Sequence, residues 1–124
     1  MDGHWREPDR HAPLTGVQAA DVVRSRIGQG RLETWFEHDR GRLLAVVSDG
    51  TRASVMLLDE PSDPGEHAID PTGTGQQDGF VLSNGQHDAY SDRDTVPLGQ
   101  ALAIVEHIVD HGHPPASVGW QVDR

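Results

Sequence analysis

The sequence predicts an α+β fold: a mostly antiparallel sheet of about five to six strands with two helices. Three observations lead to this prediction. Apolar residues recur every three to four positions in two stretches, 17–27 and 98–109. Between these stretches the apolar pattern has a period of two. The dipeptides Asp49-Gly50 and Asn84-Gly85 are typical of tight hairpin turns, which join antiparallel strands.

In the first half of the chain, a helix is expected to start after Thr15, which suits the N-cap position, and to stop at Gly28 and Gly30. Val17, Ala20, Val23 and Ile27 form its apolar stripe. Three strands follow as a meander, over 32–37, 42–48 and 51–58. The second of these is nearly all apolar in its centre, which is typical of a strand covered on both faces.

Residues 59–79 are rich in Pro, Gly and Asp, and the sequence predicts a long loop that is either functional or disordered. A short edge strand around 67–69 is compatible with the few apolar residues there. A second hairpin is predicted to pair 79–83 with 86–90.

The second helix is the clearest element. Pro97 suits its first position, the apolar stripe runs over 98–109, and Gly112 suits the position just past its end. A last strand is predicted over 118–122.

We expect residues 1–14 to be a flexible N-terminal tail, with Trp5 as the one side chain able to dock on the body. Residues 15–124 then form a single domain, because the chain is long enough for one hydrophobic core.

The charge is strongly acidic: 20 Asp and Glu against 10 Arg and no Lys give a net charge of −10. This balance argues against direct binding to nucleic acid, which needs a basic surface. It fits either good solubility or a basic protein partner that the charge would attract. The chain has no Cys, so we expect no disulfide and a cytoplasmic location. Residues 1–14 lack the apolar core of a signal peptide, and no apolar run is long enough to span a membrane, so we expect no membrane association.

A metal site is the alternative that the histidines raise. His107 and His111 lie one helical turn apart, and His113 follows closely. The motif His-Glu-x-x-His is absent, and His near a helix C-terminus is favoured by the helix dipole. No Ser lies in a nucleophile-elbow context. We therefore predict no enzyme activity, no catalytic residue, no metal and no cofactor.

The candidate binding surface is acidic and lies on the long loop and on the second hairpin with its exit. Tyr90, surrounded by carboxylates, could anchor this surface in a basic groove of a partner. The alternative is that these charged residues form an ordinary solvated surface. The candidate residues are Asp59, Glu60, Asp70, Asp88, Tyr90, Asp92 and Asp94.

Spaced residues in the region of about 30–122 carry a family resemblance. They are the hairpin region 35–58, Ser83-Asn84-Gly85-Gln86, Val96-Pro97, the helix 98–111, Gly112-x-Pro114 and Ser117-Val118-x-Trp120. This pattern resembles the first of the Imm immunity-protein families, which are common in actinobacteria and found beside deaminase-type toxin genes.

The resemblance implies a non-enzymatic protein that binds a polymorphic toxin domain of the same cell. Deaminase toxins hold nucleic-acid bases in a groove that must tolerate phosphates, and an acidic protein is suited to block it. The sequence-based hypothesis is thus an immunity protein that neutralises a toxin by acidic occlusion of its active site, and the family resemblance implies that the toxin is a nucleic-acid deaminase. A small metal-dependent enzyme using His107, His111 and His113 and a non-catalytic adaptor remain the alternatives.

Overall fold

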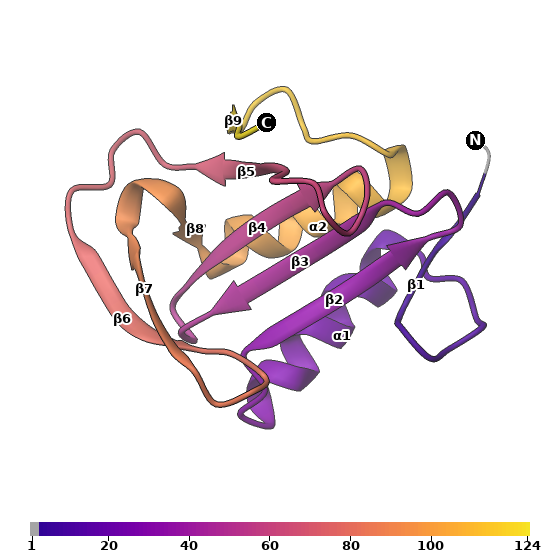
Figure 1. The fold of residues 1–124 in the computed structure, drawn as a ribbon, viewed down its shortest axis with the longest axis horizontal. Coiled ribbons are helices and arrows are strands. Elements are labelled where there is room, and N and C mark those ends of the chain that lie inside the picture. Colours follow the sequence, from indigo (N-terminus) through magenta and orange to yellow (C-terminus); the bar gives the residue numbers. More distant parts are fainter. Residues whose placement is uncertain (1–2) are drawn as a thin grey trace.

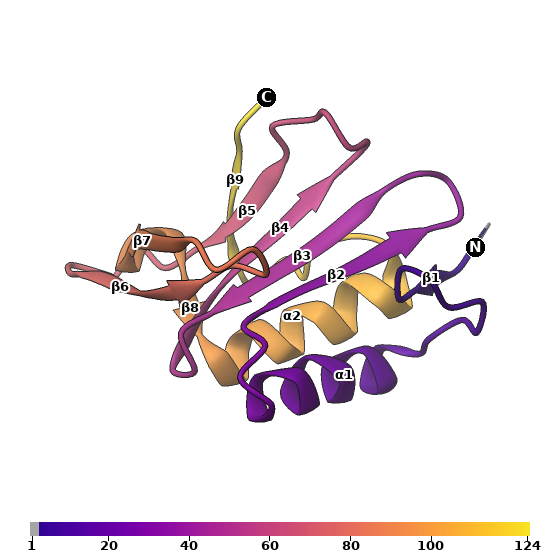
Figure 2. The ribbon, with the colours of Figure 1, turned by 60° about the horizontal axis from the view of Figure 1, so that its bottom comes forward.

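The computed structural model describes residues 3–124 and has two layers, with two helices covering one face of an antiparallel sheet (Figures 1 and 2). The helices are α1 (Gly16–Gly28) and α2 (Leu98–His111). They run beside each other under the sheet, as Figure 2 shows. The predicted α+β class is confirmed.

The main sheet holds seven strands, all paired antiparallel. Six of them follow one another in the order β1-β2-β3-β4-β5-β9, and β8 pairs with the start of β4. The sequence pattern does not predict β1 and β8, because each is only two residues long and too short to show a period of two. The bounds are β1 Trp5–Arg6, β2 Glu33–His38, β3 Leu43–Ser48, β4 Arg52–Leu58, β5 Glu66–Ile69, β8 Val96–Pro97 and β9 Gly119–Val122.

Both helices have the ends that the sequence predicts. Thr15 caps α1: its hydroxyl accepts from the N–H of Gln18, whose side chain accepts from the N–H of Thr15. Gly112 ends α2 in the left-handed conformation, with φ of 82°, which glycine adopts at little cost. Pro97 precedes the first helical residue instead of occupying it.

The core lies between the helices and the sheet. The stripe of α2 is buried as predicted, but the buried face of α1 differs from the prediction, because Val17 is 58% exposed and Gly16 faces inward. The reason is that α1 also packs closely against α2, where a small residue is needed. The largest fully buried side chains include Trp5, Phe36, Leu44, Leu57, Ile104 and Ile108.

The described part of the N-terminal segment, residues 3–14, differs from the expected flexible tail. Trp5 is 1% exposed, and its strand β1 pairs with the end of β2. The carbonyl of Trp5 also accepts from the N–H of Leu14 at 2.8 Å. The indole ring lies edge-on to His38, with centroids 5.0 Å apart, so burial of one large ring holds the segment in place. Residues 1 and 2 lie outside the described residues.

The region 59–79 also departs from the predicted loop. It contains β5, which lies between β4 and β9 and is not an edge strand, and the first residues of β6. The second hairpin is confirmed: β6 (Gln76–Val81) pairs with β7 (His87–Ser91) as a separate two-stranded sheet with a bulge. This hairpin lies on the side of the main sheet away from the helices (Figure 2).

Candidate protein-binding surface

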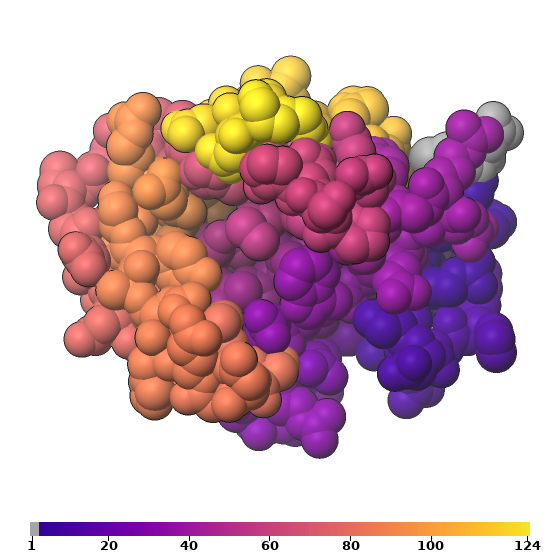
Figure 3. Space-filling view, viewed as in Figure 1, coloured from indigo at the N-terminus to yellow at the C-terminus, as the bar shows by residue number. Residues whose placement is uncertain are grey.

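The face of the main sheet opposite the helices is covered only in part. Side chains alternate along each strand, so this face carries Trp35, Ala45 and Met56, while their neighbours point to the helices. The β6–β7 hairpin covers one end of it and buries Phe80 completely. Figure 3 shows this face, with the hairpin along one side, the turn after β4 and the C-terminal strand along another, and a lower surface between them.

Acidic charge is concentrated on the segment that builds this rim. Residues 59–94 hold nine acidic residues and one Arg, a net charge of −8. The other 88 residues hold 11 acidic residues and nine Arg, a net charge of −2. Most of the excess negative charge therefore belongs to the hairpin and its flanks.

Two of the predicted site residues, Asp70 and Asp92, are turned inward by Arg52. The guanidinium of Arg52 lies 2.8 Å from Asp70 Oδ2 and donates to the carbonyl of Asp92 at 3.0 Å. It also donates to the hydroxyl of Thr95 at 2.9 Å. Hydrogen bonds from Thr72 and from Arg52 lower the pKa of Asp70 to about 2. The Asp70 carboxylate and the Asp92 backbone thus fix the base of the hairpin through Arg52, and both Asp side chains are mostly shielded from a partner.

Asp94 is tied to the neighbouring strand through a histidine. His67 on β5 has Nε2 3.0 Å from Asp94 and Nδ1 2.6 Å from Asp123. Burial lowers the pKa of His67, but the hydrogen bonds to Asp123 and Asp94 outweigh it and raise the pKa overall. Both ring nitrogens are occupied, so this histidine acts as a link between strands and has no free nitrogen to act as a base.

Asp88 and Tyr90 lie on β7, where they alternate with exposed residues. The Tyr90 ring packs edge-on against Phe80, with centroids 4.7 Å apart, and its hydroxyl lies 3.5 Å from Asp88 Oδ2. Burial, followed by the charge of Asp88, raises the pKa of Tyr90. Tyr90 is thus half-buried.

Asp59 and Glu60 lie apart from the hairpin, in the turn after β4. The Asp59 side chain is 65% exposed and lies 3.4 Å from Arg124. Arg124 also binds Asp63 and Glu66, and its hydrogen bonds hold the pKa of Asp63 far below its usual range.

The structure therefore brings together only part of the predicted set. Asp70, Asp92 and Asp94 gather around Arg52 and His67, whereas the other four residues occupy the hairpin and a separate turn. Sequence reasoning missed Asp123 and Arg124. Asp123 meets His67 across 56 positions and Arg124 meets Asp63 across 61, and no local signal marks such pairs.

The three histidines of the alternative hypothesis do meet at the end of α2. The His107 ring centroid lies 4.4 Å from that of His111 and 5.2 Å from that of His113. Burial and the two neighbouring imidazoles lower the pKa of His107. Within residues 3–124, however, no group of three or more His, Asp and Glu side chains is arranged to hold a metal ion.

Two further observations concern the chain as a whole. Among the described helices, none is both long and apolar enough to cross a membrane. In comparisons with family models, with curated proteins and with solved structures, no match to this chain was found.

Proposed function

We propose that this chain is an immunity protein that binds a bacterial toxin and occludes its active site. The observation that carries the proposal is the net charge of −8 on residues 59–94, which build the hairpin and rim over the partly open sheet face. The family resemblance adds the class of toxin, a deaminase that acts on nucleic-acid bases.

The physical argument rests on charge complementarity. An enzyme that acts on nucleic acid needs a basic groove for the phosphates, and such a groove attracts an acidic protein over long range. The field raises the association rate, and the same charges repel acidic partners. A protein that fills the groove competes directly with the nucleic acid.

Within this surface, the candidate residues have different roles. Asp70 and Asp92 hold the hairpin through Arg52, and Asp94 links it to β5 through His67. Asp59, which also lies 3.4 Å from Arg124, and Glu60 are exposed and can meet cationic side chains of a partner. Tyr90, which is amphipathic and packs against Phe80, is the anchor near the base of the hairpin, opposite Gln77.

Rescue of growth by co-expression tests the proposal. The C-terminal domain encoded by the reading frame immediately upstream is expressed in a host that lacks both genes, with and without this chain. We expect loss of viability with the toxin domain alone and recovery with this chain present. Toxicity that persists with this chain well expressed would reject the proposal, as would a neighbouring domain with no toxicity and no binding to this chain.

A further inference from the structure

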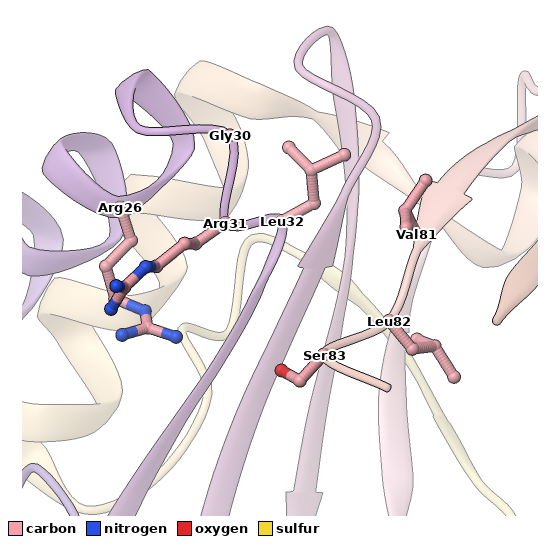
Figure 4. Close-up of a pocket in the computed structure, with 7 residues that line it drawn as sticks. All are labelled: Arg26, Gly30, Arg31, Leu32, Val81, Leu82 and Ser83. Atoms are coloured by element: carbon pink, nitrogen blue, oxygen red, sulfur yellow. The ribbon is translucent and has the colours of Figure 1, made fainter. Parts of the chain in front are cut away.

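A pocket of about 330 Å³ lies between the end of α1, the start of β2 and the tip of the β6–β7 hairpin. Figure 4 shows two guanidinium groups side by side on one wall, with the hydroxyl of Ser83 across from them. We call it the arginine pocket. Its lining includes Arg26, Arg31, Leu32, Val81, Leu82 and Ser83.

Arg26 is held in place by neutral groups. Its Nε donates to the hydroxyl of Thr34 at 3.1 Å, and its Nη2 donates to the carbonyl of Glu33 at 3.0 Å. A guanidinium has five N–H groups, so about three of them remain for another acceptor. The side chain is therefore oriented in advance, which lowers the entropic cost of binding an anion.

The two cations of the arginine pocket have no acidic partner within the described chain. Neither Arg26 nor Arg31 forms an ion pair with a carboxylate there, although the chain has twice as many acidic residues as Arg. The nearby carboxylate of Glu33 accepts from the N–H of Ser83 at 3.2 Å instead. Two neighbouring positive charges repel each other, and an anion placed between them relieves that repulsion.

The pocket continues along an open edge of the main sheet. A second cavity of about 230 Å³ shares Arg26 and Ser83 with it and runs between Thr34 and Trp35 of β2 and the segment 7–9, where Glu7, Asp9 and Glu33 also line it. β1 pairs with β2 only at Glu37 and His38, so the first part of this edge has no strand beside it in residues 3–124. An extended segment can add to such an edge through backbone hydrogen bonds.

We propose that the arginine pocket binds a single carboxylate carried by an otherwise apolar, extended segment of a partner protein, which lies along the open edge of β2. The paired guanidinium forks match the flat carboxylate group, and Leu32, Val81 and Leu82 supply apolar walls for the rest of the segment. Binding here does not require that the partner be a toxin.

The test uses the full chain and a defined probe. A capped tripeptide with the sequence Val-Glu-Val is titrated into labelled protein and followed by the amide shifts of Gly30, Leu32 and Ser83. The same titration is made with a Val-Gln-Val peptide and with inorganic phosphate at equal ionic strength. The variants are Arg31→Gln, which removes one cation of the pocket, and Arg24→Gln, a control on the same helix whose Arg is exposed and paired with Asp21.

The proposal predicts saturable shifts at these amides with the Glu peptide only. Arg31→Gln should weaken binding about tenfold, as for loss of a charged hydrogen bond, and Arg24→Gln should leave it within about twofold. Thermal unfolding of each variant shows that it is folded, which is expected because both side chains are exposed. Equal binding of the Gln peptide, equal loss in both variants, or tighter binding of phosphate than of the Glu peptide would overturn the proposal.

Discussion

Arg52 on β4 lies 2.8 Å from Asp70 beyond β5, and the same guanidinium holds Thr95 and the carbonyl of Asp92 in the turn that leads to α2. One side chain therefore fixes three segments around the base of the acidic hairpin. The hairpin also rests on the main sheet through contacts of β6 with β3 and the hydrogen bond from Ser83 to Glu33, so Arg52 fixes its base in particular.

Arg52→Ala should lower the free energy of unfolding by roughly 2 to 3 kcal/mol, because it removes the hydrogen bonds that the guanidinium donates to Asp70, Thr95 and the carbonyl of Asp92. Arg52→Lys should recover only part of this loss, since an ammonium group lacks the fork that reaches Asp70 and Thr95 together. Urea unfolding measures both values. Arg93→Ala, one residue beyond Asp92 and exposed, is the control; an equal loss there would contradict this role of Arg52.

His67 should make stability depend on pH. Its pKa in the folded protein is raised above the ordinary 6.5, so its stabilising effect is complete below 6.5 and is lost as the pH rises through the folded value. The difference in unfolding free energy between the wild type and His67→Asn should be larger at about pH 5.5 than at about pH 8.5. His87→Asn, which removes an exposed imidazole on β7, should leave the pH profile unchanged. A difference for His67→Asn that grows with pH would contradict the link to Asp94 and Asp123.

Gly16 should not tolerate a side chain. A Cβ there would lie 2.6 Å from Asp110 Oδ2 and even closer to the carbonyl oxygen of Glu106, so α1 would have to move away from α2. Gly16→Ala should cost about 1 to 3 kcal/mol. Gly28→Ala, in the last turn of the same helix, meets nothing within 4 Å and should be neutral or stabilise by about 0.5 kcal/mol. If Gly16→Ala and Gly28→Ala lowered the melting temperature equally, the close packing of α1 against α2 at Gly16 would be contradicted.

Trp5 should contribute to stability as a core residue does. Trp5→Ala removes a ring that is 1% exposed and should cost roughly 3 to 5 kcal/mol. Trp5→Phe should cost only about 1 kcal/mol, because the indole N–H has no hydrogen-bond partner in the described chain and only volume is lost. Denaturant unfolding separates the two. The control is Val17→Ala, at an apolar position that is 58% exposed, which should change the free energy of unfolding by less than about 0.5 kcal/mol. An equally small change for Trp5→Ala would contradict the core role of Trp5 and support the prediction of a flexible tail.

The sequence was sufficient wherever the signal is local. Thr15, Gly112 and the Asp49-Gly50 turn act through their nearest neighbours, and each element they mark is present. The fold class follows from these elements.

Long-range pairing could not be predicted in the same way. Trp5 is buried because the end of β2 and the helices leave a space for it. β5 is a central strand because β9, which is 50 positions away at its closest register pair, returns beside it. The candidate site depends on such contacts. In the sequence, Asp70 and Asp92 cannot be told from Asp59. In the fold, Asp70 and Asp92 lie beside Arg52 and have a structural role, whereas Asp59 is exposed.

The central claim, recognition of a toxin through the acidic hairpin, is tested most directly by the affinity of the purified complex at two salt concentrations. Asp78→Asn/Asp88→Asn removes two charges from the hairpin, and Asp21→Asn/Glu106→Gln removes two from the helical layer as the matched control. The hairpin variant should slow association about tenfold at low salt and flatten the salt dependence, while the control variant changes the rate less than about twofold. Equal effects of the two variants, or a salt-independent affinity of the wild type, would contradict the claim.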